Sequence, residues 1–202
     1  MRLAYVLLAL TAGLGFTPAR AHDHAHMQQM EAAKPLSGES IYNLASRWRD
    51  QDGKSIELAS LRGEPVVVAM AYTSCKDICP LIVANMVAIE NQAKAKSLTK
   101  VRFAFFSLDS QVDTPERLKA YAEEHNLDLS QWRLYHGDDH AVRELAAALG
   151  VRYRREASGG FDHANIITLL DADGNIALQQ SGGQDGGADF VAKLGALAVS
   201  AR

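Results

Sequence analysis

The segment of the chain that decides its fold reads VVVAMAYTSCKDICP and occupies residues 66–80. Its first seven residues, Val66–Tyr72, are all apolar, which predicts a strand buried on both faces at the centre of a mixed sheet. The polar turn that follows holds both cysteines of the chain, Cys75 and Cys79, and ends in a proline. An apolar pattern with helical spacing then predicts a helix over about residues 81–96. Two thiols are therefore expected where a central strand passes into a helix.

Strands and helices alternate along the rest of the chain. Upstream, Asp52-Gly53 predicts a turn before a strand over 55–58. Downstream, Asp113-Thr114-Pro115-Glu116 is typical of a helix start, with a capping side chain, a proline in the first turn and an acid beside the positive end of the helix dipole. In chain order we expect a strand over 101–108, then the helix that starts near Pro115 and runs to about 125, and a strand over 132–135. These are followed by a helix over 139–149, a strand over 151–155, a hairpin over 165–179 with its turn at 171–174, and a helix over 188–199. Alternation that closes with a hairpin and a helix predicts an α/β, thioredoxin-like fold with a mixed central sheet flanked by helices.

The composition fits one ordinary globular domain. Of the 202 residues 48% are apolar, and 21 Lys+Arg stand against 24 Asp+Glu, a formal net charge of −3. This length is enough for one domain with a substantial buried core. Since no basic stripe is visible, we expect no nucleic-acid partner. Two cysteines are too few for a small protein held together by disulfides.

The first 21 residues have the pattern of a secretory signal peptide. Arg2 supplies the positive start, residues 3–16 are apolar apart from one threonine, and Ala19-Arg20-Ala21 fits the small-x-small cleavage pattern. An uncleaved anchor is the alternative, but the apolar run is shorter than the ~20 residues that span a bilayer. No cysteine directly follows it for lipid attachment. We therefore expect cleavage after Ala21, a periplasmic location and no stable membrane anchor, followed by a flexible tail and linker over 22–39 and a domain over 40–202.

Cleavage there would create a metal-binding N-terminus with His22, His24 and His26, followed by two methionines. The free amine, two backbone amides and the His24 imidazole can bind Cu(II) or Ni(II) in one square plane. We therefore predict an accessory metal site in the tail. The alternative is a polar tail whose histidines have no function.

The spacing of Cys75 and Cys79 suits two chemistries. Residues four apart on a helix share one face, so the two sulfurs could bind one metal ion or oxidise to a disulfide after a small unwinding. We expect the helix N-terminus to lower the thiol pKa, which favours the thiolate that both chemistries need. Two inert core cysteines are the third alternative. Spacing alone does not separate metal binding from redox chemistry.

The loop expected before the last hairpin carries Asp162-His163-Ala164 and no proline. A thioredoxin-type reductase has a cis-proline there, opposite its cysteines. His163 in that position can face the cysteine turn, and two thiolates with one imidazole form a soft ligand set suited to copper as Cu(I) or Cu(II). Zinc remains possible for the same set. Asp109 and Asp113 could orient His163 or form a partner surface, and Asp113 could instead cap its helix.

These motifs together resemble the Sco/SenC family of thioredoxin-like copper chaperones, which act in the assembly of cytochrome c oxidase. The resemblance covers the domain from about Ile41 to the C-terminal helix. It is carried by Asp52-Gly53-Lys54, Leu61-Arg62-Gly63, residues 72–80, residues 109–116 and Asp162-His163. It implies that Cys75, Cys79 and His163 are copper ligands and that Asp77 and Asp109 lie near the site. Lys76 departs from the family pattern, because many members have proline there.

Residues and resemblance together predict a periplasmic copper metallochaperone that holds copper through two cysteines and a histidine. It would deliver the copper to a partner, a subunit of cytochrome oxidase with a copper site. A thiol–disulfide reductase that keeps the cysteine pair reduced is a second expected partner. The alternative function is a thiol–disulfide oxidoreductase that acts through Cys75 and Cys79 by mixed-disulfide exchange.

Overall fold

A computed structural model describes residues 40–76, 79–157, 159–181 and 188–200. A seven-stranded sheet has the order β2-β1-β5-β4-β3-β8-β9, and β6 and β7 form a separate two-stranded sheet. The strands are β1 (Arg47–Asp50), β2 (Ser55–Glu57), β3 (Val66–Ala71), β4 (Arg102–Ser107), β5 (Trp132–Gly137), β6 (Tyr153–Arg155), β7 (Phe161–His163), β8 (Ile166–Leu170) and β9 (Ile176–Ser181). The helices are α1 (Cys79–Ala95), α2 (Pro115–Glu124), α3 (Asp139–Leu149) and α4 (Ala188–Ser200), with 3-10 turns η2 (Ile41–Asn43) and η3 (Leu58–Leu61).

The main sheet is mixed, as the sequence predicts. β3, β4 and β5 run parallel to one another, while β8 is antiparallel to β3, and β1 is antiparallel to β5. β3 lies between β4 and β8, and all six of its residues are buried, which explains its unbroken apolar sequence. The α/β, thioredoxin-like fold is confirmed.

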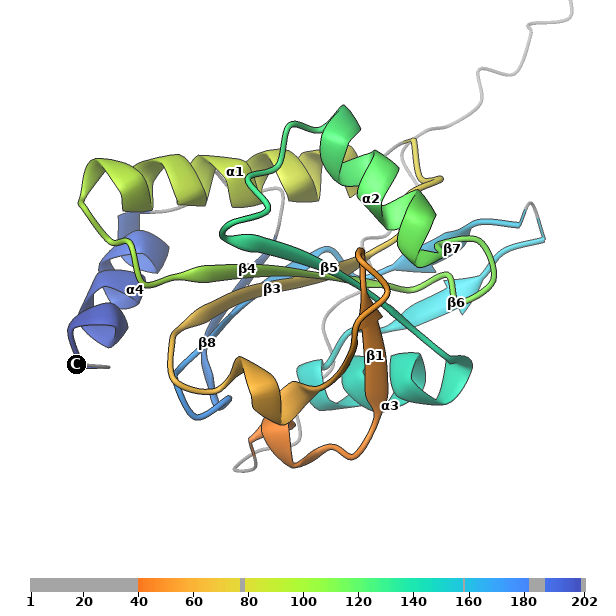
Figure 1. Ribbon diagram of the computed structural model, residues 1–202, viewed down its shortest axis with the longest axis horizontal. Coiled ribbons are helices and arrows are strands. Elements are labelled where there is room, and N and C mark those ends of the chain that lie inside the picture. Colours follow the sequence, from red (N-terminus) through yellow and green to blue (C-terminus); the bar gives the residue numbers. More distant parts are fainter. Residues whose placement is uncertain (1–39, 77–78, 158, 182–187, 201–202) are drawn as a thin grey trace, which may run out of the picture.

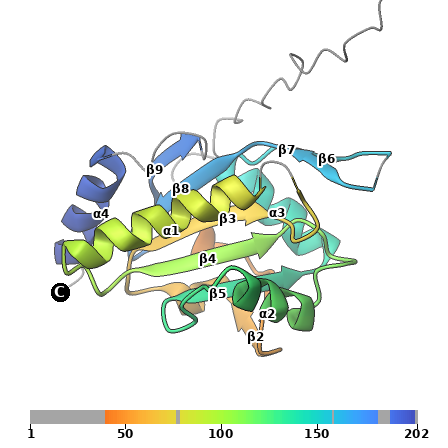
Figure 2. The same ribbon diagram turned by 90° about the horizontal axis from the view of Figure 1, so that it is seen from above.

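Helices cover both faces of this sheet. Figure 1 shows α1 and α2 on one side and α3 on the other, and Figure 2 shows α4 beside α1 at one end. α1 packs against β3 and β8, and α4 packs against α1 and β9. In the core, stacked Phe103 and Trp132 join β4 to β5, and Glu90 of α1 accepts a hydrogen bond of 2.8 Å from the Trp132 indole. No described helix is both long and apolar enough to cross a membrane.

The helix after the cysteine turn starts earlier than predicted, and only one cysteine belongs to it. α1 begins at Cys79 rather than near residue 81, because Pro80 is tolerated in the first turn, where its missing N–H needs no partner. Cys75 lies in the turn before α1, and its Sγ accepts a hydrogen bond of 3.4 Å from the Cys79 N–H. The expectation that both cysteines share a helix face is therefore wrong. Cys75 instead partners an amide at the start of the helix.

The start of α2 is confirmed, but its capping residue is not Asp113. Thr114 is the N-cap, and its side chain accepts a hydrogen bond from the Arg117 N–H. Asp113 is fully buried, and its carboxylate accepts hydrogen bonds from Thr73 and Ser107 instead. A hydroxyl can cap equally well, which leaves the carboxylate available for the interior.

The residues around His163 form a strand rather than the expected loop. β7 ends at His163 and pairs antiparallel with β6, so that His163 lies opposite Tyr153. The resulting ribbon extends from the body of the molecule (Figure 2). The short β7 has too few residues for a clear alternating pattern, so its strand was not predicted from the sequence.

Two glycine turns differ in what surrounds them, which gives a test of the fold. Gly174 has a φ of +85°, and a Cβ added there would lie 2.5 Å from the Tyr42 ring and 2.6 Å from the Ser40 hydroxyl. Gly53 has a similar φ of +80°, with nothing within 4 Å. We expect Gly174→Ala to lower the free energy of unfolding by about 3 kcal/mol, because strain and overlap add. Gly53→Ala should cost only about 1 kcal/mol, from backbone strain alone. Equal losses in urea denaturation would contradict this description of the Gly174 turn.

Candidate metal centre

The proposed ligands come from three different elements that meet beyond the carboxyl end of β3. Cys75 lies in the turn between β3 and α1, Cys79 is the first residue of α1, and His163 is the last residue of β7. Cys79 has no exposed surface and His163 is 6% exposed, while Cys75 is half-buried. The site is therefore closed around Cys79 and His163 and open to solvent at Cys75.

His163 presents a lone pair to the Cys79 thiol. Its Nε2 lies 3.2 Å from the Cys79 Sγ, although the two residues are 84 positions apart in sequence. Its Nδ1 lies 3.2 Å from the Ala164 carbonyl oxygen, which can only accept a hydrogen bond. Nδ1 therefore carries the proton, and the lone pair of Nε2 faces the Cys79 sulfur. This tautomer is the one that a metal-ligating histidine adopts when its other nitrogen donates to a backbone carbonyl.

Cys75 completes the group through Cys79. The thiol of Cys75 hydrogen-bonds that of Cys79, in addition to its contact with the Cys79 N–H. The three side chains thus form a chain from Cys75 through Cys79 to His163. They are not yet arranged around one point, since no three His, Cys, Asp or Glu side chains of the described residues form a metal-binding cluster. Release of the Cys75 sulfur from the amide would let it turn toward the other two.

The thiol of Cys79 is not activated in the way that its place at a helix start predicts. Its pKa is raised above the usual value of a thiol, first by the hydrogen bond with Cys75 and then by burial. The expected lowering is therefore wrong for Cys79, because both effects favour the protonated form more than the first turn of α1 favours the thiolate. The reduced pair is held as a hydrogen-bonded dithiol.

Tyr72, at the end of β3, holds the two sides of the site together. Its hydroxyl accepts a hydrogen bond of 3.1 Å from the Phe161 N–H and lies 3.3 Å from the Phe161 carbonyl, so that β3 is fixed to β7. Its ring packs edge-on against both Phe161 and His163, at centroid distances of 5.3 and 5.9 Å. Burial raises the pKa of Tyr72 to about 12. Tyr72 and Phe161 therefore position His163 and cover one side of it.

A buried carboxylate fastens the start of the cysteine turn. Asp113 accepts hydrogen bonds from the Thr73 N–H at 3.0 Å, from the Thr73 hydroxyl at 2.5 Å and from the Ser107 hydroxyl at 2.5 Å. Burial raises the pKa of Asp113, and these hydrogen bonds oppose the shift. Because Thr73 is two residues before Cys75, Asp113 acts on the cysteine turn through Thr73. Its carboxylate accepts hydrogen bonds from Thr73 and Ser107, rather than orienting His163 or capping α2.

Asp109 lies on the other side of the same network and fastens the β6–β7 ribbon. Its carboxylate is 3.5 Å from the Arg155 guanidinium, which also lies over the Phe161 ring at 4.4 Å. The Asp109 side chain is 2% exposed and that of Arg155 is 44% exposed, so the arginine covers the carboxylate from the solvent side. Arg155 therefore joins the ribbon that carries His163 to the loop after β4. Sequence reasoning did not identify Arg155, because nothing in a run of arginines indicates which one has a buried partner.

Comparison with known proteins identifies the family. The SCO1/SenC family model matches residues 40–197. The chain belongs to the SCO1/SenC family. A SCO1 protein homolog of Bacillus subtilis (strain 168) is 28% identical over 138 residues, which cover 67% of this chain and 71% of the relative.

Solved structures of other SCO1/SenC proteins share this fold. A SCO1/SenC family lipoprotein from Bacillus anthracis str. Ames has a TM-score of 0.72 at 27% identity, covering 83% of this chain and 99% of that one. Bradyrhizobium japonicum ScoI, solved with copper bound, has a TM-score of 0.63 at 24% identity, covering 75% of this chain and 96% of that one. The similarity extends over nearly all of either neighbour.

Some residues predicted for this SCO1/SenC site lie outside the described residues. These are Asp77, between the two cysteines in the sequence, and His22, His24 and His26, near the start of the chain. The predicted signal peptide over 1–21 and the predicted tail and linker over 22–39 lie outside them as well, and both stay predictions.

The different burial of the two thiols in this SCO1/SenC domain predicts different reactivity. Cys79 is fully buried with a raised pKa, so at pH 8 its thiolate is scarce, whereas Cys75 is half-buried. In the reduced, metal-free protein we expect iodoacetamide to modify Cys75 at least about tenfold faster than Cys79. A rise of one pKa unit lowers the reactive thiolate fraction tenfold, and burial limits access of the reagent to Cys79 as well. Peptide mass spectrometry over time measures both rates, and in guanidinium chloride they should become similar. Equal rates in the native protein would contradict the closed geometry around Cys79.

Proposed function

We propose that this protein is a copper metallochaperone that holds its metal through Cys75, Cys79 and His163. The observation that carries the proposal is the contact between the Cys79 Sγ and the His163 Nε2, with the His163 Nδ1 proton donated to a backbone carbonyl. Two soft sulfurs and one imidazole nitrogen favour copper over hard, oxygen-preferring cations. Copper bound to a relative of the same fold supports this choice.

The separation of the donor atoms suits a shared metal. Two ligands at about 2.0 and 2.3 Å from one tetrahedral metal lie roughly 3.5 Å apart. The 3.2 Å between His163 and Cys79 is close to that value, so only a small displacement is needed. Copper binding would also require the loss of protons from the thiols, because the thiolate is the ligand.

Unequal exposure of the ligands supports delivery rather than permanent storage. Transfer by ligand exchange requires an incoming group to reach the metal while it is still held. Cys75 is half-buried, whereas Cys79 and His163 are shielded. A recipient would therefore displace Cys75 first, while Cys79 and His163 keep the metal until the exchange is complete.

The setting that we propose for this transfer is the periplasm, after export and cleavage behind Ala21. The recipient would be a copper site of a cytochrome oxidase subunit, in line with the role of the family. A thiol–disulfide reductase would keep the pair reduced, and His22, His24 and His26 would add a second copper site in the tail.

A thiol–disulfide oxidoreductase is the second candidate, supported by the hydrogen bond between the two thiols. One thiolate would attack a partner disulfide, and the other would resolve the mixed disulfide, so that two electrons pass to the partner and a Cys75–Cys79 disulfide forms. That reaction needs no imidazole facing Cys79. A cis-proline opposite the cysteines is also missing, since the described residues contain no cis peptide bond.

An anaerobic competition titration with Cu(I) on the reduced chain tests the proposal. His22, His24 and His26 are replaced by alanine in every sample, so that the tail does not contribute. We expect one Cu(I) ion to bind tightly to each chain, and the affinity to be at least about tenfold weaker in His163→Ala. Loss of a group that only hydrogen-bonds a metal ligand already weakens metal binding by about this factor, and loss of the ligand itself should weaken it no less. His136→Ala is the matched control, since this half-buried histidine bonds to the Asp113 carbonyl instead. Unchanged affinity in His163→Ala, with a mixed disulfide accumulating in Cys79→Ser, would favour the oxidoreductase.

A further inference from the structure

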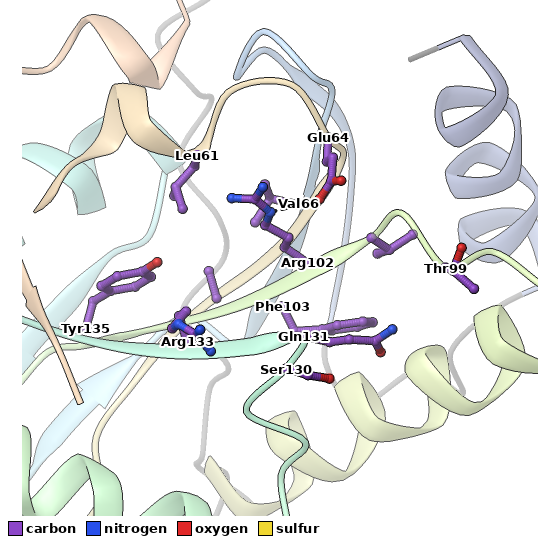
Figure 3. A pocket seen from close by; sticks show the side chains of 12 residues that line it. Leu61, Glu64, Val66, Thr99, Arg102, Phe103, Ser130, Gln131, Arg133 and Tyr135 are labelled. Carbon is purple, nitrogen blue, oxygen red and sulfur yellow. Dashed lines mark hydrogen bonds and ion pairs between the residues drawn. The ribbon is translucent and has the colours of Figure 1, made fainter. Parts of the chain in front are cut away.

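A cavity of about 470 Å³ lies at the opposite end of the sheet from the cysteines. Its walls include Arg102, the first residue of β4, and Arg133, near the start of β5. β3 runs parallel to β4, and β4 to β5, and the cysteines follow the opposite, carboxyl end of β3. This volume is in the range of sites for small molecules. Figure 3 shows Arg102, Arg133 and Tyr135 gathered around it, with Leu61 and Val66 as apolar walls.

Arg133 is half-buried, and one edge of its guanidinium group has no hydrogen-bond partner among the described residues. Its Nη1 donates to the carbonyl oxygens of Leu129 and Trp132, the latter at 2.7 Å, which fixes the guanidinium in place. In the described part of the chain, its Nε and Nη2 make no hydrogen bond, and Arg133 has no ion-pair partner. The positive charge of a half-buried guanidinium with no ion-pair partner among the described residues is available to an anion. Nε and Nη2 form one edge of the planar guanidinium, which matches the two oxygens of a carboxylate or phosphate.

The neighbouring groups extend this recognition. Arg102 pairs through Nε with Glu64 at 2.8 Å, which leaves its two terminal nitrogens for another acceptor. Burial raises the pKa of Tyr135 to about 12, so its phenol keeps its proton and can donate. Glu64 is the one acid among the described residues of the cavity wall, against two arginines. The adjoining cavity adds two cations, Lys54 and Arg47, and two acids, Asp50 and Glu57. Glu57 pairs with Arg47, and Asp50 accepts hydrogen bonds from the backbone N–H groups of Asp52 and Lys54.

We propose that this cavity binds a small oxyanion, a compound with a carboxylate or phosphate group, between Arg133, Arg102 and Tyr135. Arg133 would donate two parallel hydrogen bonds to two oxygens of the acid group. Arg102 and Tyr135 would donate further hydrogen bonds to the same group. The apolar walls would receive the carbon skeleton of a compound larger than inorganic phosphate. The site shares no residue with the cysteine centre, so it does not depend on the copper proposal.

Titration of the reduced, metal-free full-length chain with two probes tests this inference. Inorganic phosphate and succinate are added separately, at a constant ionic strength adjusted with chloride, because surface attraction to anions depends on salt. Two-dimensional ¹H–¹⁵N NMR follows the amides of residues 99–104 and 130–135. We expect saturable shifts there, with phosphate, succinate or both, and the more tightly bound probe identifies the acid group.

Arg133→Lys provides the decisive variant, because it keeps the charge and removes the planar edge. We expect it to weaken binding by at least about tenfold, since a lysine cannot form the bidentate contact. Arg102→Gln should also weaken binding, and it serves as the second variant if Arg133→Lys disturbs the fold. Arg143→Lys, at an exposed arginine of α3, is the matched control and should bind as the parent does. Shifts that do not saturate, or an affinity that neither substitution lowers, would overturn the proposal.

Discussion

Cys79→Ser should abolish tight Cu(I) binding, with a loss of affinity of more than about a hundredfold. Structural metal sites with four ligands are worth about 10–16 kcal/mol, so one ligand carries on the order of 3 kcal/mol. Serine keeps nearly the same size but replaces a soft sulfur by a hard oxygen, which Cu(I) disfavours. Because Cys79 contacts both Cys75 and His163, its loss separates the two remaining ligands. The competition titration with Cu(I) measures this effect.

Met86→Leu is the matched control for Cys79→Ser. Met86 is a second buried sulfur on the same helix, and leucine preserves its volume. This variant should retain one tight equivalent. If Cys79→Ser also retained it, the buried cysteine would not be a ligand, and the metal centre would have to be sought elsewhere.

Asp113→Ala should lower the free energy of unfolding by about 3 kcal/mol. The substitution leaves the Thr73 N–H and the hydroxyls of Thr73 and Ser107 without their buried acceptor, and an unsatisfied buried donor costs about 1–3 kcal/mol. Arg117 donates to the Thr73 hydroxyl at 3.1 Å and cannot replace the lost acceptor. Urea denaturation of the reduced, metal-free protein measures the change.

The same substitution should also weaken Cu(I) binding at the proposed site, because Asp113 holds Thr73, two positions before Cys75. Asp52→Ala is the matched control: this aspartate is exposed and pairs with Lys119, so its loss should change stability by less than about 0.5 kcal/mol. Asp113→Asn keeps one acceptor oxygen and should recover part of the loss. An Asp113→Ala protein as stable as Asp52→Ala would show that the network does not hold the cysteine turn.

The order of the elements could be predicted from the sequence because it depends on local patterns. The run Val66–Ala71 is apolar throughout since β3 is covered on both faces, and the turn at Asp171–Gly174 carries its own signature residues. Helix α3 starts after Asp138 and ends with Gly150 in a left-handed conformation. Such signals act over a few residues and need no knowledge of the tertiary structure.

The details of the site could not be predicted in the same way because they depend on contacts between distant residues. The predicted facing of His163 toward the cysteines is confirmed, yet the strand that carries it was missed, since β7 is defined by its pairing with β6. The role of Asp113 depends on Thr73, 40 positions away, whereas capping by the adjacent Thr114 is a local feature. The raised pKa of Cys79 likewise follows from burial, which the helix-start argument does not include.

The long separation between the cysteines and His163 also determines when the centre can exist. Cys79 begins α1, the first helix after β3, and His163 stands just before β8, the strand that pairs with β3 on one side. The imidazole therefore reaches the thiols only once β8 has docked onto β3. A chain in which β8 has not yet docked onto β3 would hold the two thiols without the imidazole. The proposed three-ligand capture is thus available to the finished fold alone, so an incompletely folded molecule would have no tightly held copper to pass on.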